Sequence, residues 1–312
     1  MVQFFARRLV FMFISVVGAT VVIFTLSRVA QDPRELFVPD SGYGISPEAW
    51  EELGNKLGFD KPVVVQYFLW LGRMLKGDFG ESLSMQQPVS HIIGGKIGAT
   101  VQLAIGGWIV AIIVGVPIGV LAAVQRGTVF DYLGRGVALF GQALPAFFVG
   151  IVLILIFAVY FEWLPVATRP VNFDIKFYIL PCITLGWAPA AGIMRLTRSS
   201  MLEIMDSEFV KLARAKGVSN FKIIWKHALR NSLIPPLTSA LLLMAGFLNG
   251  ALVVETIFAW PGIGWLALSR AVYDNDLPLL LGTVFVFIAI YLVFALLADI
   301  LYALIDPRIR YS

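Results

Sequence analysis

Long apolar runs limit what this chain can fold into. Six stretches are almost free of charged residues, and they lie at 9–26, 100–124, 137–160, 178–197, 237–259 and 279–301. A helix needs about 20 mostly apolar residues to cross about 30 Å of hydrocarbon, so each stretch is long enough to span a membrane. Only 14% of the residues are charged, against about 25% in soluble domains. The sequence therefore predicts an all-α, polytopic membrane protein with six transmembrane helices.

The basic residues between these stretches predict the orientation of the chain. If both termini are cytoplasmic, the two short outer loops hold only Arg169, Lys176 and Arg270, and most other Lys and Arg residues lie in inner segments. That distribution follows the positive-inside rule. Residues 1–29 are predicted to be a retained transmembrane anchor, because Arg28 stands where a signal-peptide cleavage site needs a small residue. Residues 306–312 then form a cytoplasmic tail.

The segment between the first two spans, residues 30–94, is predicted to form an external helical cap. Its stretches PEAWEELGNKLGFD and QYFLWLGRMLKGDFG have the pattern of amphipathic helices interrupted by Gly and Pro. Acidic residues outnumber basic ones in the long outer loop, which suits either of two roles. The cap could receive a basic partner surface, or its charges could simply face solvent.

The inner loop EFVKLARAKGVSNFKIIWKHALRN, residues 208–231, interrupts the apolar chain with charge. Its periodicity predicts two amphipathic helices separated by Gly217, with Ser219 or Asn220 capping the second and Pro235-Pro236 ending it. The predicted apolar face of the second helix holds Phe221, Ile224, Trp225, Ala228 and Leu229. A basic helix on anionic lipid headgroups is one interpretation. The small residues Ala213, Ala215 and Gly217 favour the other, a docking element for a partner protein.

Glycine, proline and a few polar residues interrupt the spans. The breaks at 115–119, Pro145, Pro181 and Pro189 suit either close helix packing or the lining of a pathway. Asn249 could line a passage or hydrogen-bond between helices. The stretch ETIFAWPGIG, 255–264, could form an external gate, or it could combine an interfacial Trp260 anchor with a Pro261-Gly262 turn.

Several function classes find no support in the sequence. His91 and His227 lack metal-ligand spacing, and the single cysteine, Cys182, is predicted to be a buried thiol. The nearest approach to a phosphate-binding loop, Gly94-Gly95-Lys96, lacks the earlier Gly and the Ser or Thr that it needs. No catalytic pattern indicates an enzyme. A self-contained secondary transporter or channel is disfavoured because the spans lack a central ionisable relay and inverted repeats.

The loop at 208–231 resembles the EAA loop of type I ABC importer permeases. Ala213, Gly217 and Leu229 match that pattern strictly. The stretch ARAKG…HALRNSLIPP is similar to the corresponding sequence in the peptide/nickel branch of these permeases. The same holds for four shorter motifs, which are GDFGES (77–82), LPAFFVG (144–150), ETIFAWPGIG (255–264) and DPRIR (306–310). DPRIR could contact a partner protein. The favoured interpretation is that it ends the last helix and places basic residues on the cytoplasmic side.

The resemblance implies a type I permease fold over 95–305, with a coupling loop at 198–236, in the inner membrane of a prokaryote. It also implies a second homologous permease as heterodimer partner, two cytoplasmic ABC ATPases and an external solute-binding protein. This chain would bind no cofactor of its own, because ATP and Mg belong to the ATPases. The implied cargo is small peptides, and nickel chelates, glutathione or oligosaccharides are alternatives.

Two groups of residues are expected to carry this function. Those expected to couple to the ATPases are Lys211, Leu212, Ala213, Arg214, Ala215, Lys216, Gly217, Val218, Ser219, Asn220 and Phe221. Those expected in the translocation pathway or gate are Asn249, Glu255, Trp260, Pro261 and Gly262.

Overall fold

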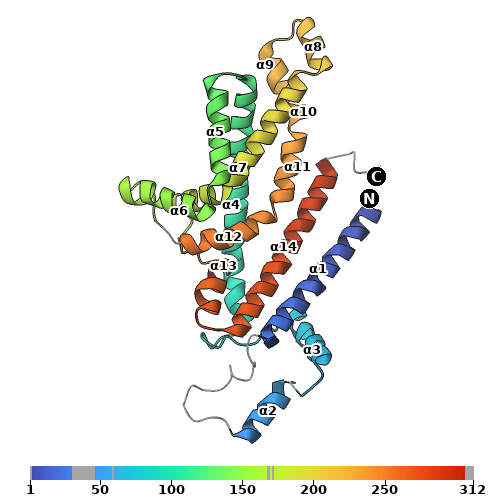
Figure 1. Ribbon diagram of the computed structural model, residues 1–312, viewed down its shortest axis with the longest axis vertical. Helices are drawn as coiled ribbons and strands as arrows, with labels where there is room; N and C mark the ends of the chain where they lie inside the picture. The colour runs from blue at the N-terminus through green and yellow to red at the C-terminus, as the bar shows by residue number, and fades with distance from the viewer. Residues whose placement is uncertain (1, 30–45, 58–59, 167–168, 171, 306–312) are drawn as a thin grey trace. The chain divides into compact units, whose positions relative to one another are not determined.

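The computed structural model describes residues 2–29, 46–57, 60–166, 169–170 and 172–305 (Figure 1). Within these residues the chain forms helices and connecting turns, together with one antiparallel bridge between Glu81 and Pro88. The prediction of a helical protein is therefore confirmed. The predicted tail at 306–312 and residues 30–45 of the predicted cap lie outside the described residues.

Contacts divide the chain into two compact units, and each is described by itself. Unit 1 comprises Met1–Gly98 and Ile263–Leu292. Its elements are α1 (Val2–Val29), α2 (Pro47–Leu57), α3 (Val63–Leu75), the start of α4 (Val89–Val124), α13 (Ile263–Leu266), the π-helical η4 (Ala267–Val272) and the start of α14 (Leu277–Ile305). Helices α2 and α3 occur where the sequence predicts helices in the cap.

Two apolar clusters hold unit 1 together. In the first, Phe24 of α1 packs against Tyr67 and Trp70 of α3, with ring centroids 5.5 and 5.6 Å apart. In the second, the first turns of α4 meet α13, η4 and α14 through Val89, Ile92, Ile93, Ile263, Leu266, Ala271 and Leu279. Helix α3 therefore packs on α1 as an apolar neighbour, not as an isolated surface helix.

The GDFGES stretch gives unit 1 a buried polar connection. Gly77 and Gly80 adopt positive φ angles of 78° and 79°, which favour glycine. The loop that they form brings Ser82 to Asp276, and the Ser82 hydroxyl donates to the Asp276 carboxylate over 2.5 Å. The other oxygen of Asp276 accepts from the Leu279 amide at 3.1 Å, so the same carboxylate also caps α14.

Unit 2 comprises Ala99–Gly262 and Val293–Ser312. Besides the remaining parts of α4 and α14, its elements are α5 (Val129–Ala143), α6 (Ala146–Leu153) with the π-helical η2 (Ile154–Tyr160), α7 (Lys176–Met205), α8 (Glu208–Ala215), α9 (Asn220–Lys222), the π-helical η3 (Ile223–Ala228), α10 (Leu229–Ser232), α11 (Ile234–Leu243) and α12 (Gly246–Ile257). In Figure 1, α5 runs beside α7, whereas α6 turns sharply away from α5.

Glycines let α4 and α7 approach to backbone contact. A Cβ at Gly115 would lie 2.6 Å from the Ala190 carbonyl oxygen, and one at Gly119 would lie 2.6 Å from that of Met194. On the other helix, a Cβ at Gly186 would lie 2.7 Å from the Gly107 carbonyl oxygen. Small residues commonly serve close packing between membrane helices. The packing interpretation of the glycines at 115 and 119 is therefore confirmed, and Pro117 between them stays within α4.

The helices account for most of the predicted spans. Among the described residues, 3 helices are long and apolar enough to cross a membrane by length and composition, namely Val89–Val124, Lys176–Met205 and Leu277–Tyr302. The number rises to 5 if two bent pairs, Val129–Tyr160 and Ile234–Ile257, each count as one span. Helix α1 contains the predicted first span, and its apolar stretch Val10–Thr25 is shorter than these.

The two bent pairs correct the expectation of simple straight spans at 137–160 and 237–259. The first pair bends by 110° and the second by 57°. At the first break, Leu144 has an extended ψ of 129° before Pro145, as the residue preceding a proline prefers, and Pro145 has no N–H to continue the helix. Pro181 and Pro189 instead lie inside α7 without ending it.

Candidate functional site

The predicted helix, glycine turn and helix are present at 208–232. Helix α8 ends at Ala215, and Gly217 follows with a φ of 78°. The Val218 amide donates to the Ala213 carbonyl at 3.2 Å, and the Gly217 amide donates to the Arg214 carbonyl at 2.9 Å. This pair of bonds is a Schellman motif, which needs a left-handed residue at the position of Gly217.

The second half of the loop departs from the regular α-helix that the sequence predicts. Ser219 lies at the N-cap position, but its side chain makes no capping hydrogen bond, and Ile223–Ala228 is π-helical. Because π-helical bonds join residues five apart, Ile223 and Ala228 face the same way, and both are buried. Within the predicted apolar face, Ala228 is buried and Ile224 and Leu229 are half-buried, whereas Phe221 is 71% exposed and Trp225 is 49% exposed. Pro235 and Pro236 begin α11 and do not end the preceding helix, which already ends at Ser232.

The predicted coupling residues gather at one tip of unit 2, where α8 packs against η3 (Figure 1). Nine of the eleven are exposed, and Ala213 and Val218 are half-buried. Exposed apolar side chains are added by Phe209, Leu212, Phe221 and Trp225. Val210, on the same helix α8, is buried. Lys211 is held by Glu208 at 2.8 Å. We call this surface, 208–226, the coupling tip. Exposed apolar groups with a basic surround are typical of a protein-binding surface.

Below the tip, a buried carboxylate ties α5 to α7. Asp131, at the start of α5, is 1% exposed and accepts from two nitrogens of Arg198 of α7 at 2.7 and 2.8 Å. It also accepts from the Gly127 amide at 3.0 Å, and Arg135 lies 3.4 Å away. This site was not predicted from the sequence. The available signal was an acid shortly before the predicted span at 137–160, with Arg135 one helical turn later.

The predicted gate residues lie in a tight turn after α12. Trp260 is fully buried, donates its indole N–H to the Ala99 carbonyl at 2.9 Å and meets Tyr178 edge-on with centroids 4.9 Å apart. The interfacial-anchor interpretation of Trp260 is therefore wrong, because such an anchor has to be exposed. Ala259, just before it, has a φ of 46°, a conformation that costs free energy for a residue with a Cβ.

Glu255 and Gly262 meet within this turn. Glu255 is fully buried, and a Cβ at Gly262 would overlap its carboxylate. Pro261 lies between Trp260 and Gly262 and is half-buried. Asn249, by contrast, is exposed on α12. The structure thus brings together four of the five predicted pathway residues.

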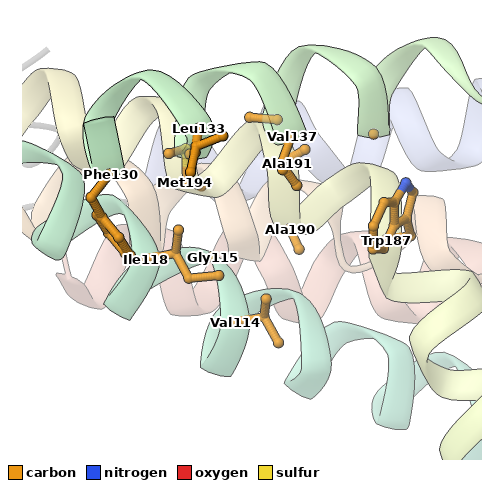
Figure 2. Close-up of a pocket in the computed structure, with 13 residues that line it drawn as sticks. Val114, Gly115, Ile118, Phe130, Leu133, Val137, Trp187, Ala190, Ala191 and Met194 are labelled. Carbon is orange, nitrogen blue, oxygen red and sulfur yellow. The ribbon is translucent and has the colours of Figure 1, made fainter. Parts of the chain in front are cut away.

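Two cavities in unit 2 were not predicted from the sequence. The apolar cavity, about 280 Å³, lies among α4, α5 and α7, and Figure 2 shows Val114, Ile118, Phe130, Leu133, Trp187 and Met194 around it. The break cavity, about 260 Å³, is lined by residues at the bends of the two bent pairs and by Trp187 and Pro189 of α7. Trp187 lines both cavities.

Comparison with known proteins identifies the family. The sequence profile described as "Binding-protein-dependent transport system inner membrane component" matches residues 115–311, and a profile for the N-terminal part of such components matches residues 1–104. The chain belongs to this family. The family resemblance seen in the loop and in the shorter motifs is therefore confirmed, and the chain is an inner membrane component of a transport system.

Curated relatives match this inner membrane component over its whole length. The dipeptide transport system permease protein DppB of Escherichia coli K12 is 36% identical, and both chains are covered completely. The oligopeptide transport system permease protein AppB of Bacillus subtilis 168 is 35% identical, and the di/tripeptide transport system permease protein DppB of Pseudomonas aeruginosa is 36% identical, again with complete coverage of both chains.

Solved structures support the fold of the inner membrane component. A chain of the MetNI methionine ABC transporter, in an inward-facing conformation, superposes with a TM-score of 0.56 at 13% identity. The match covers 69% of this chain and 96% of that one. At this identity the likeness shows the fold alone, which is that of a chain of an ABC transporter.

Proposed function

We propose that this chain is the permease subunit of an ATP-driven importer that moves small peptides across the cytoplasmic membrane. The observation that carries the proposal is the full-length similarity to permeases named for dipeptides, oligopeptides and di/tripeptides. The coupling tip adds support, because it combines a glycine turn with exposed apolar and basic side chains outside the apolar helices. In this function the chain is a non-catalytic transport subunit.

The proposed topology has six spans with both termini cytoplasmic. Helix α1 within residues 1–29 is the anchor, residues 30–94 form the external cap, and residues 95–305 form the permease domain. Each bent pair then counts as one span, and the tail at 306–312 is cytoplasmic. The positive-inside distribution of Lys and Arg supports this orientation.

The proposed partners divide the work. Two cytoplasmic ABC ATPases bind ATP and Mg and receive the coupling tip in a surface groove, within a coupling loop at 198–236. A second homologous permease completes a heterodimer around the pathway, and an external solute-binding protein delivers the peptide. The turn around Glu255, Trp260, Pro261 and Gly262 is proposed as the external gate, with Asn249 facing the pathway.

A matched pair of substitutions at Gly217 tests the coupling role. The space around its Cα is open, so only the positive φ resists a side chain there. Asn tolerates that conformation, so Gly217→Asn keeps the turn and adds bulk to the docking surface. In proteoliposomes with all subunits, we expect this variant to insert normally and to lose uptake while ATP hydrolysis continues. Normal peptide uptake would refute the assignment of the tip.

Competing functions predict different outcomes in the same assay. If the transported solute is a nickel chelate, glutathione or an oligosaccharide and not a dipeptide, uptake would still require ATP, and only the cargo would differ. A secondary transporter or channel would move solute in vesicles that contain this chain alone. A headgroup-binding loop would leave ATP-driven uptake unaffected by Gly217→Asn.

A further inference from the structure

Helix α3 is apolar enough for a membrane but too short to cross one. Its 13 residues, VVVQYFLWLGRML, contain Arg73 as their only charged residue. At 1.5 Å per residue they extend about 20 Å, whereas the hydrocarbon core is about 30 Å thick. Lys61 precedes the helix and Lys76 follows it, so basic residues lie at both of its ends. Such a helix has to bury its apolar side chains against protein or in one face of the bilayer.

Contacts with α1 indicate the depth at which α3 lies. The hydroxyl groups of Tyr67 and Thr20 are hydrogen-bonded at 2.9 Å, and the Tyr67 ring meets Phe24 edge-on with centroids 5.5 Å apart. Thr20 lies inside the apolar stretch Val10–Thr25. Arg28 is the first charged residue after that stretch, and Thr20 lies about 12 Å from it along the helix. Helix α3 therefore packs on a part of α1 that belongs to the hydrocarbon (Figure 1).

The side chains of α3 fall into three sectors around its axis, since successive residues of an α-helix are about 100° apart. Tyr67, Trp70 and Met74 face the cluster that α3 shares with α1. Gln66 and Arg73, seven residues apart, form a narrow polar sector. The outer apolar sector contains Val64, Val65, Phe68, Leu69 and Leu75, which are from 42% to 68% exposed. A wide apolar face beside a narrow polar stripe is typical of a helix that lies in a membrane interface.

Lipid is the occupant that the surroundings of the outer apolar sector favour. Directly after Thr20, α1 exposes Val21 and Val22 at 44% and 57%, so at this depth the exposed side chains of α1 are apolar as well. The sector itself consists of Val, Leu and Phe, whereas the cores of protein interfaces are enriched in Tyr, Trp and Arg. Contact with water would leave five large apolar side chains hydrated, which is unfavourable.

We propose that α3 is embedded in the outer leaflet of the membrane and that its outer apolar sector contacts lipid acyl chains. Its polar sector then faces the headgroups, where Gln66 and Arg73 remain hydrated. The inference rests on the proposed topology, because α1 has to span the membrane with its Arg28 end outside. It goes beyond that topology by dividing the external cap into a helix in lipid, α3, and a helix in water, α2.

Embedding α3 also fixes the start of the loop that follows. Lys76 caps α3, and Gly77 turns the chain with its positive φ of 78°. The loop that begins there carries Ser82, which donates to Asp276 at the start of α14. The GDFGES loop is therefore held at the membrane surface from both sides, by an interfacial helix before it and by a buried carboxylate within its turn.

Spin labels test the location of α3. Val64→Cys, Phe68→Cys and Leu75→Cys each place a nitroxide in the outer apolar sector, and Glu51→Cys places one at an exposed position of α2. The native Cys182 is buried, so the parent protein gives the labelling background. In the complete transporter in bilayers, relaxation by oxygen, which is enriched in hydrocarbon, is compared with relaxation by a water-soluble nickel complex. We expect the oxygen-to-nickel ratio on α3 to exceed that on α2 at least about tenfold.

Two other results would overturn the proposal. Nickel relaxation as strong on α3 as on α2 would place α3 in water, and weak relaxation by both reagents would show that a partner protein covers it. The proposed topology has its own check, because a membrane-impermeant maleimide added to spheroplasts should label Glu51→Cys. Absence of this labelling would refute the topology and the outer-leaflet location together, whereas labelling of α2 with α3 in water would refute the embedding alone.

The same charge placed in two sectors of α3 gives a second measurement. Phe68→Glu puts a carboxylate among acyl chains, whereas Gln66→Glu puts one in the polar sector two residues away. Because a charge is costly in hydrocarbon, we expect Phe68→Glu to lower the Tm of the transporter in nanodiscs more than Gln66→Glu does. Phe68→Leu keeps the sector apolar and should retain the parent Tm. Equal losses for the two Glu variants, or a loss for Phe68→Leu as large as that for Phe68→Glu, would contradict the proposal.

Discussion

Asp276 is a single residue on which two segments of unit 1 depend. Burial raises its pKa, but hydrogen bonds from Ser82, from Ser84 and from the first turn of α14 outweigh that effect, so the pKa lies below its ordinary value. A carboxyl group with a lowered pKa stabilises the fold above its unfolded pKa, and that contribution disappears as the pH falls through the folded pKa. The contribution is therefore present at neutral pH and is lost below about pH 4.

We predict that Asp276→Asn lowers Tm at pH 7 and that the difference from the parent shrinks toward zero near pH 3. The reason is that the amide cannot take up a proton, whereas the carboxylate of the parent loses its charge in this range. Thermal unfolding of the detergent-solubilised protein, followed by tryptophan fluorescence, measures both. Asp274→Asn is the control, since Asp274 is exposed two residues away. A difference in Tm that stays constant with pH would contradict the prediction.

Gly262 is a second position where the structure leaves no space for a larger side chain. The Glu255 carboxylate occupies the place of a Cβ, and Glu255 is itself fully buried. We predict that Gly262→Ala lowers the free energy of unfolding by about 1–3 kcal/mol, as overpacking of a dense core does. Gly136→Ala is a matched control on an exposed stretch of α5 with open space around it. A Gly262→Ala variant as stable as this control would show that the turn can relax.

At the scale of elements, two ion pairs near the coupling tip differ in burial and allow a direct comparison. Asp131 is buried against Arg198, whereas the Arg126–Asp206 pair, at 3.5 Å, is 64% and 73% exposed. Asp131→Asn leaves a mostly buried guanidinium without its carboxylate, and we expect a loss of about 3 kcal/mol in the free energy of unfolding. Arg126→Gln should cost under about 1 kcal/mol. Equal effects in denaturant titrations would refute this ranking.

The coupling tip yields a prediction about association rather than folding. The rings of Phe221 and Trp225 lie with centroids 6.2 Å apart, tilted by 45°, and both side chains are exposed. We expect the double variant Phe221→Ser, Trp225→Ser to change stability by less than about 1 kcal/mol. Its affinity for the ATPase subunits should fall at least about tenfold, because buried aromatic anchors dominate protein interfaces. Affinity is measured by titration in nanodiscs.

Tyr273 provides the control for the tip. It is 83% exposed but lies outside the coupling tip, so Tyr273→Ser should leave ATPase affinity unchanged. If the tip variant bound the ATPases normally and instead lost affinity for anionic vesicles, the loop would be a headgroup-binding element.

Local sequence patterns predicted the helices of this chain well. The reason is that the periodicity of apolar residues and the helix-breaking effect of Gly and Pro both act over a few residues. The long apolar helices, the helices α2 and α3, and the turn at Gly217 followed from such patterns, but the predicted spans at 137–160 and 237–259 are bent helix pairs. The π-helical register of η3 did not, since it depends on which side chains find space beside Val120 and Met201. The exposed positions of Phe221 and Trp225 were missed for the same reason.

Across the whole molecule, the contacts that define the sites join residues far apart in sequence. Ser82 meets Asp276, Trp260 meets Ala99, and the break cavity draws on three separate spans. No spacing rule relates such positions, so a single sequence could indicate that these residues matter but not which of them meet. The family resemblance predicted the helical permease architecture, but it did not reveal the cavities.

The glycine contacts between α4 and α7 constrain how unit 2 deforms. At Gly115, Gly119 and Gly186, backbone of one helix lies directly against the other, without the side-chain layer that usually separates two helices. Sliding either helix along the other would drive bulkier residues into those carbonyl oxygens. In the proposed function, force that reaches α7 from the coupling tip would therefore tilt α4 and α7 together and would not slide one helix past the other.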